Sequence, residues 1–321
     1  MITAIVTAAA CFVAGVALYP ALLTVLVRLG AGQMVQEYNP QNHQVKAGTP
    51  TMGGLLFGLI AVAAWLAVDR SRAGFVIAYA LVGGAAVGFL DDLANVRGLG
   101  SLGLAVRQKL VLQVVVGVAV GFGLHQIGAT LQNLPGLGLL DLGWGIVPLA
   151  ALAVVATTNA VNVTDGVDGL AGSCTAIALV GAVVAGVWLH APAAVLMGAA
   201  LLGGVAAFLL YNWHPARIFM GDTGALGLGA ALTAIAVEAH LLWLLPLLGI
   251  VFAVETASVI INVTAITRFQ RRLFQASPIH HHFEKLGIRE EHLVLLFAGA
   301  GAVALALTLL VAHGVAAAPV P

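Results

Sequence analysis

Charged residues are scarce in this chain. Of its 321 residues, 13 are Lys or Arg and 13 are Asp or Glu, or 8%, whereas 61% are hydrophobic. Soluble domains are about one quarter charged, so this composition excludes a soluble globular protein. The apolar runs also lack the alternation of apolar and polar residues that is typical of membrane β-barrels. The remaining possibility is a bundle of helices, because a helix satisfies its own backbone hydrogen bonds in a bilayer. The predicted fold class is an all-α, polytopic integral membrane protein.

Cysteine is equally rare. Cys11 and Cys174 lie in or beside apolar runs, so no disulfide framework is indicated. The first apolar run has the length of a signal peptide, but it lacks a basic start and other apolar runs follow it. We interpret it as a retained helix. No second domain and no internal repeat is recognisable, which predicts a single transmembrane domain over residues 1–321.

The apolar runs set the number of membrane spans. A bilayer requires about 20 apolar residues per helix. By this measure the sequence predicts ten spanning helices, at residues 4–28, 50–68, 73–91, 108–126, 143–161, 172–190, 193–212, 222–239, 241–266 and 293–314.

Basic residues predict the orientation, because cytoplasmic loops are enriched in Lys and Arg. With ten spans, Arg70 and Arg72 fall on one side and the other 11 basic residues fall on the opposite side. That opposite side is therefore predicted to be cytoplasmic, with both termini outside. The 11 residues are Arg28, Lys46, Arg97, Arg107, Lys109, Arg217, Arg268, Arg271, Arg272, Lys285 and Arg289.

Five aspartates gather on the predicted cytoplasmic side: Asp91, Asp92, Asp165, Asp168 and Asp222. Orientation rules do not require this, because acidic residues contribute little to topology. Ionisable groups at a membrane surface more often mark a site. An acidic active site at this surface is therefore the working hypothesis.

Each aspartate motif allows two interpretations. In "GFLDD", Asp91 and Asp92 repel each other at a helix C-terminus, which favours a divalent cation or a base with a raised pKa; the alternative is a solvated helix end paired with Arg97. In "NAVNVTDGVDGLAG", the alternative is turn and capping chemistry. In "MGDTG", Asp222 either caps a helix or holds Mg²⁺ against a phosphate at the helix N-terminus.

Two further segments lie on the same predicted side. Lys46 in "KAGTPTMGG" is either a phosphate partner or an ordinary positive-inside residue. "PIHHHFE" contains three adjacent histidines. If the segment is extended, they alternate direction and do not converge on one ion, so contact with a phosphate or nucleotide is favoured over metal binding, with a solvated loop as the alternative.

Taken in order, the motifs resemble those of the polyprenyl-phosphate N-acetylhexosamine-1-phosphate transferases. They are "KAGTPTMGG", "GFLDD", "NAVNVTDGVDGLAG", "NWHPARIFMGDTG", "ETASVI" and "SPIHHHFE", and they extend from His43 to about Glu291. "TPTMGG" and "PIHHHFE" are similar to the branch that transfers muramoyl-pentapeptide rather than N-acetylglucosamine.

The resemblance implies a reaction at the inner face of the bacterial cytoplasmic membrane. Undecaprenyl phosphate attacks UDP-N-acetylmuramoyl-pentapeptide, UMP leaves, and lipid I of peptidoglycan synthesis remains in the membrane. Mg²⁺ is the implied cofactor, bridging the diphosphate. A homodimer is suggested, and no nucleic acid partner is implied.

The resemblance also implies roles for individual residues. Asp222 is similar to the Mg²⁺ ligand, and Asp91 and Asp92 to the pair that meets the lipid phosphate. The nucleotide and diphosphate contacts are implied at Lys46, Thr51, Asn162, Asp165, Asp168 and Phe219, and further catalytic or nucleotide contacts at Asn212, His280, His281 and His282. Two departures are Ala225 in place of the family's usual Ser, and a lysine-poor segment after Asp92 that retains Arg97, Arg107 and Lys109.

Two other functions stay open at this point. Transfer of N-acetylglucosamine-1-phosphate to the same lipid would use the same aspartates. An ion-coupled transporter would instead place its ionisable groups near the middle of the membrane and show repeat symmetry. The acids here lie at one face, which favours an enzyme.

Overall fold

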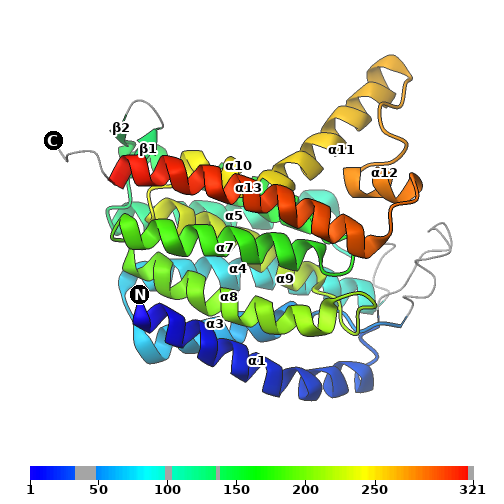
Figure 1. The fold of residues 1–321 in the computed structure, drawn as a ribbon, viewed down its shortest axis with the longest axis horizontal. Coiled ribbons are helices and arrows are strands. Elements are labelled where there is room, and N and C mark those ends of the chain that lie inside the picture. Colours follow the sequence, from blue (N-terminus) through cyan, green and yellow to red (C-terminus); the bar gives the residue numbers. More distant parts are fainter. Residues whose placement is uncertain (33–47, 98–102, 135–137, 317–321) are drawn as a thin grey trace.

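The computed structural model of the chain is a bundle of long helices (Figure 1). It describes residues 1–32, 48–97, 103–134 and 138–316. The long helices are α1 (Ile2–Arg28), α3 (Gly54–Val68), α4 (Arg72–Val96), α5 (Val106–Gln126), α6 (Ile146–Thr164), α7 (Leu170–Trp188), α8 (Pro192–Asn212), α9 (Gly221–Glu238), α11 (Ile250–Phe269) and α13 (Glu290–Ala316). The short helices are α10 (Leu245–Leu248) and α12 (Ile279–Lys285), with 3-10 turns at Gly143–Gly145 and Leu242–Leu244.

The all-α membrane architecture predicted from the composition is confirmed. In the described part of the chain, eight helices are long and apolar enough to cross a membrane. The other two long helices, α3 and α9, lie where spans were predicted but are shorter, with 15 and 18 residues. The number of spans and the side on which the termini lie stay predictions.

Two predicted boundaries differ from the structure. The segment 241–266 is divided into the 3-10 turn Leu242–Leu244, α10 and α11, because Gly249 leaves helical geometry between them and Pro246 fits only the first turn of a helix. Helix α4 continues to Val96, beyond the predicted end at residue 91. Asp91 and Asp92 therefore lie within its last turns rather than at its final residue.

Helix α9 forms the centre of the bundle. Every residue from 223 to 237 is buried, and α3, α4, α6 and α8 pack around it. The alanines and glycines of α9 leave room for this close packing, since small residues let helix backbones approach inside a membrane. Its first turn, which carries Asp222, is consequently held by the surrounding helices.

The close crossing of α4 and α9 lies beside Asp222. A Cβ atom on Gly88 of α4 would overlap the backbone carbonyl of Asp222. We expect Gly88→Ala to displace the start of α9, to destabilise the fold by about 1–3 kcal/mol through overpacking, and to lower turnover. Thermal unfolding of the purified protein at a fixed heating rate, together with an activity assay, measures both effects.

Gly58→Ala in α3 is the matched control. A Cβ atom at Gly58 meets no atom of the described residues within 4 Å, and Ala favours a helix over Gly by about 1 kcal/mol. The control should leave activity unchanged and stability equal or higher. Equal behaviour of the two variants would show that the crossing at Gly88 does not hold Asp222 in place.

The motif-bearing segments lie at one end of the bundle, where the ends of α4, α6 and α8 meet the starts of α5, α7 and α9. The first turn of α1 and the last turn of α13 lie at the left in Figure 1, whereas α12 lies at the right, beside the far end of α11. Helix α11 leans away from the other long helices (Figure 1). A small antiparallel hairpin of β1 (Leu131–Leu134) and β2 (Gly138–Asp141) lies at the end opposite α12.

Candidate active site

The carboxylate of Asp92 joins α4 to the first turn of α9. Its Oδ1 accepts a hydrogen bond from the backbone N of Asp222 at 3.1 Å. Its Oδ2 accepts two more, from the backbone N and the side-chain Oγ1 of Thr223, at 2.9 and 2.6 Å. The amides at a helix N-terminus have no partner within the helix, and a carboxylate there also meets the positive end of the helix dipole. Asp92 therefore orients the turn that presents Asp222.

Asp222 is held by side chains from two other helices. Its Oδ1 accepts a hydrogen bond from Nδ2 of Asn162 in α6 at 2.7 Å. Its Oδ2 is in contact with the ammonium of Lys109 in α5. The carboxylate remains 21% exposed, so it is accessible to a ligand.

Asp91 contacts the same lysine and also the carboxyl of Asp222. Its Oδ2 is 3.6 Å from Nζ of Lys109, and its Oδ1 accepts a hydrogen bond from the backbone N of Leu104 at 2.7 Å. One ammonium thus contacts two carboxylates, from α4 and α9, and offsets their mutual repulsion. Lys109 was absent from the predicted site set, although a lysine one turn into an apolar helix is itself a signal of a functional site.

The loop between α6 and α7 brings two more predicted residues to this end. Asp165 is partly buried, and that burial, together with the negative charges of Asp222, Asp92 and Asp168, raises the pKa of its carboxyl well above the usual range. Its carboxyl is thus within electrostatic range of the other aspartates. The five aspartates predicted to share one face do share one region of the fold.

Asp168 and Asn212 are buried and fix the loops around them. Oδ2 of Asp168 accepts a hydrogen bond from the backbone N of Ala216 at 3.0 Å and lies 3.1 Å from Nδ1 of His214. Oδ1 of Asn212 accepts from the backbone N of Gly169, and its Nδ2 donates to the carbonyl of Ile218, both at 2.9 Å. These bonds tie the loop after α6 to the loop after α8.

Thr51 and Phe219 lie next to Asp92, where the segment before α3 meets the segment before α9. The backbone N of Phe219 donates to Pro50 at 2.8 Å, and its carbonyl accepts from Gly53 at 2.9 Å. The Oγ1 of Thr51 and the Oδ2 of Asp92 lie beside Gly221, whose φ of +73° places it in the left-handed region that suits glycine. Lys46, assigned to the nucleotide pocket, lies outside the described residues.

The three histidines differ from the predicted extended arrangement. They lie on the short helix α12, so successive side chains rotate around the helix axis and point in different directions. His280 is fully buried, with Nδ1 3.1 Å from Oε2 of Glu255 and with Nε2 directed at Gly166, next to Asp165. His281 contacts Glu284, and Nδ1 of His282 accepts a hydrogen bond from the backbone N of Gln275 at 3.3 Å.

The structure thus brings together most of the predicted set. Asp91, Asp92, Asn162 and Asp222 meet around Lys109, and His280 adjoins the loop that carries Asp165 and Asp168. The hydrogen bonds given above for His281 and His282 join them to residues of their own segment, Glu284 and Gln275. Sequence reasoning missed the pairing of Lys109 with these aspartates, and it missed His214.

The donor set suits magnesium. Mg²⁺ prefers carboxylate oxygens and water and usually keeps several waters, so one or two partly exposed carboxylates suffice when a substrate phosphate completes the shell. Asp222 is partly exposed, and Asp91 contacts both it and the same lysine. The chemistry of these residues fits the cation implied by the resemblance.

Comparison with known proteins identifies the family. A family model described as glycosyl transferase family 4 matches residues 73–240, and a phospho-N-acetylmuramoyl-pentapeptide-transferase signature matches residues 46–57. The phospho-N-acetylmuramoyl-pentapeptide-transferase of Geobacillus thermodenitrificans is 39% identical over 305 residues, which cover 92% of this chain and 94% of the relative. That of Symbiobacterium thermophilum is 43% identical over 297 residues, covering 89% and 88%.

The chain belongs to the phospho-N-acetylmuramoyl-pentapeptide-transferase family. Membership in this transferase family confirms the resemblance read from the six motifs and leaves the ion-coupled transporter without support. The signature range contains Lys46 and Thr51, and the family model spans the four helices that supply Asp91, Lys109, Asn162 and Asp222.

Proposed function

We propose that this chain transfers phospho-N-acetylmuramoyl-pentapeptide from its UDP-linked donor to undecaprenyl phosphate, producing lipid I and UMP. One structural observation supports the proposal in addition to family membership. Carboxylates of α4 and α9, the ammonium of α5 and the amide of α6 converge in a single partly exposed cluster at the end of the bundle. Phosphoryl transfer needs such a cluster, because the protein mainly positions anions and neutralises their charge.

Asp91 is the residue that accepts the proton of the lipid phosphate. Both oxygens of Asp92 already accept hydrogen bonds from α9, whereas the carboxyl of Asp91 adjoins the carboxyl of Asp222 and the ammonium of Lys109, the two groups that we assign to the phosphates and their metal ion. A base needs an oxygen that can reach the proton. Asp92 instead fixes the first turn of α9 and thereby positions Asp222.

Asp222 is the magnesium ligand, and Lys109 lies where it neutralises the phosphates together with the ion. Bound Mg²⁺ would polarise the diphosphate and stabilise the charge on the departing UMP. Asn162 holds the carboxylate of Asp222 in a fixed orientation through its 2.7 Å hydrogen bond. The lipid phosphate attacks directly, since it is already an anionic nucleophile and a covalent aspartyl intermediate would offer little advantage.

The nucleotide lies toward the α6–α7 and α8–α9 loops. Lys46, Asp168 and Phe219 form the uracil pocket, and Thr51 and Asp165 contact the ribose and the diphosphate. Asn212 keeps these two loops together through its bonds to Gly169 and Ile218. His280 faces the loop at Gly166, and His281 and His282 supply outer contacts. The site faces the cytoplasm, where 11 of the 13 basic residues are predicted to lie.

Donor specificity provides the test. Purified protein with Mg²⁺ and undecaprenyl phosphate is incubated separately with UDP-N-acetylmuramoyl-pentapeptide and with UDP-N-acetylglucosamine, and UMP release is measured. We expect release with the muramoyl-pentapeptide donor and at most about 1% of that rate with the glucosamine donor, since a site built for polar groups discriminates strongly when those groups are absent. Release with the glucosamine donor alone would assign the chain to the alternative reaction.

A further inference from the structure

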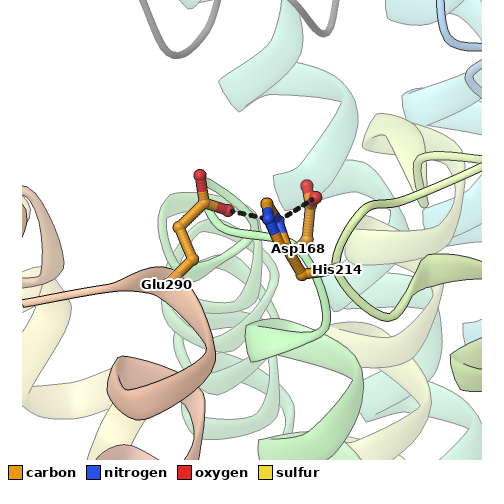
Figure 2. A group of neighbouring side chains, drawn as sticks. All are labelled: Asp168, His214 and Glu290. Atoms are coloured by element: carbon orange, nitrogen blue, oxygen red, sulfur yellow. Dashed lines mark hydrogen bonds and ion pairs between the residues drawn. The ribbon is translucent and has the colours of Figure 1, made fainter.

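A second cluster of ligand atoms lies beside the nucleotide loops. Asp168 of the α6–α7 loop, His214 of the α8–α9 loop and Glu290 at the start of α13 come from three distant parts of the chain, and their ligand atoms all lie within 4.8 Å of one another. Figure 2 shows the imidazole of His214 between the two carboxylates. Its Nδ1 is 3.1 Å from Oδ2 of Asp168 and 3.4 Å from Oε2 of Glu290.

The charges at this cluster favour a cation. Two carboxylates approach the same ring nitrogen, which has only one position for a proton or a metal ion. Carboxylates that converge in this way repel each other unless a positive charge lies between them. The carboxylates are 3% and 13% exposed, so water screens this repulsion only in part.

The spacing fits a small metal ion. A tetrahedral ion bound at about 2.0–2.2 Å holds neighbouring ligand atoms about 3.3–3.6 Å apart. The two nitrogen–oxygen distances of 3.1 and 3.4 Å are near this range. The backbone N of Ala216 donates to Oδ2 of Asp168 at 3.0 Å and fixes that carboxylate, as outer-shell partners do at metal sites. His214 is 33% exposed, which leaves access for the ion and for a water ligand.

The donor set selects the kind of metal. One imidazole and two carboxylates suit zinc and similar transition metals, whereas Mg²⁺ prefers an all-oxygen shell. The magnesium ligand proposed above, Asp222, is absent from this cluster. The two sites therefore differ in both position and chemistry.

We propose that Asp168, His214 and Glu290 bind one transition-metal dication of the zinc class, and that its occupancy weakens binding of the nucleotide. The second part rests on the proposed function, because Asp168 is there a contact of the uracil ring. When a metal ion binds the carboxylate of Asp168, that carboxylate is not available to contact the uracil ring. The metal would then act as an inhibitor that competes with the donor substrate.

A direct measurement of metal binding tests the site and requires no assay of enzyme activity. The full-length purified protein is stripped of metal and titrated with Zn²⁺ against a chromogenic chelator in excess Mg²⁺, and Co²⁺ is used to detect four-coordinate binding by visible absorption. We expect one ion per chain. His214→Gln and Glu290→Gln should each weaken binding by about 100-fold or more, since even outer-shell changes cost about 10–100-fold.

His313→Gln and Glu291→Gln are the matched controls. His313 packs against Trp188 near the other end of α13, and Glu291 pairs with the exposed Arg289. Both should bind Zn²⁺ as the unchanged protein does. Failure of the unchanged protein to bind one ion in excess Mg²⁺ would overturn the site, and so would retained binding in both His214→Gln and Glu290→Gln.

UMP binding tests the consequence. At a Zn²⁺ concentration about tenfold above its Kd, competition should raise the apparent Kd of UMP about tenfold in the unchanged protein and leave it unaltered in Glu290→Gln. An unaltered Kd in the unchanged protein would overturn the competition. If UMP does not bind even without Zn²⁺, the proposed function and the competition both fail, while the metal titration decides the site by itself.

Discussion

Asp222→Asn is expected to lose turnover by about 10³-fold or more, a loss of the size seen when one preorganised charge-stabilising group is removed from an active site. The amide has the same shape as the carboxylate, so the first turn of α9 keeps its geometry. What disappears is the negative charge that faces Lys109 and that we assign to Mg²⁺. Raising the Mg²⁺ concentration should therefore not restore activity. UMP release measured over a series of Mg²⁺ concentrations provides the result.

The matched control is the same substitution at the other end of the bundle. Asp141 lies in the hairpin strand β2, where its Oδ1 accepts a hydrogen bond from the backbone N of Gly143 at 2.9 Å. Asp141→Asn should retain normal turnover. If Asp222 only favoured the start of α9 through the helix dipole, its loss would cost about 0.3–1 kcal/mol of stability and leave turnover intact. Substantial activity in Asp222→Asn would support that second interpretation.

Much of the fold could be predicted from the sequence, because a membrane permits only a few kinds of backbone structure. Apolar runs predicted the positions of ten long helices, since each run must satisfy its backbone groups internally. The break at Gly249 was missed because leucines and other apolar residues surround it and the hydropathy does not change there. Hydropathy likewise gives no sign that α9 lies at the centre of the bundle; that follows from its small residues, which permit close packing.

The site was predictable only in part. Aspartates and histidines stand out in an apolar sequence, so Asp91, Asp92, Asp165, Asp168 and Asp222 could be placed on one face by counting helices. Their partners could not be assigned in this way, because pairing depends on side-chain geometry between helices. The pairing of Lys109 with Asp222, 113 residues away, is one example. The burial of His280 against Glu255 is another, and it required the helical form of α12 that the sequence did not indicate.

Asp91 and Asp92 should respond differently to the same substitution. Asp92→Asn replaces one carboxylate oxygen with an NH₂ group, which then faces the amide donor of either Asp222 or Thr223. At least one buried donor is then left without an acceptor, at a cost of about 1–3 kcal/mol. The thermal midpoint should fall, and turnover should fall with it because the turn that carries Asp222 loses its anchor.

Asp91→Asn is expected to separate chemistry from stability. The amide oxygen of Asn can still accept the hydrogen bond from the backbone N of Leu104, and the ion pair with Lys109 is loose at 3.6 Å, so the loss of stability should stay within about 1 kcal/mol. Turnover should nevertheless fall by about 10²–10⁴-fold, since an amide does not accept the proton of the lipid phosphate. Midpoints measured at one heating rate, beside UMP release, test the pair of variants. The residue whose loss affects only the reaction is the one that meets the substrate. The two assignments would therefore be reversed by normal turnover in Asp91→Asn, or by lost turnover with an unchanged thermal midpoint in Asp92→Asn.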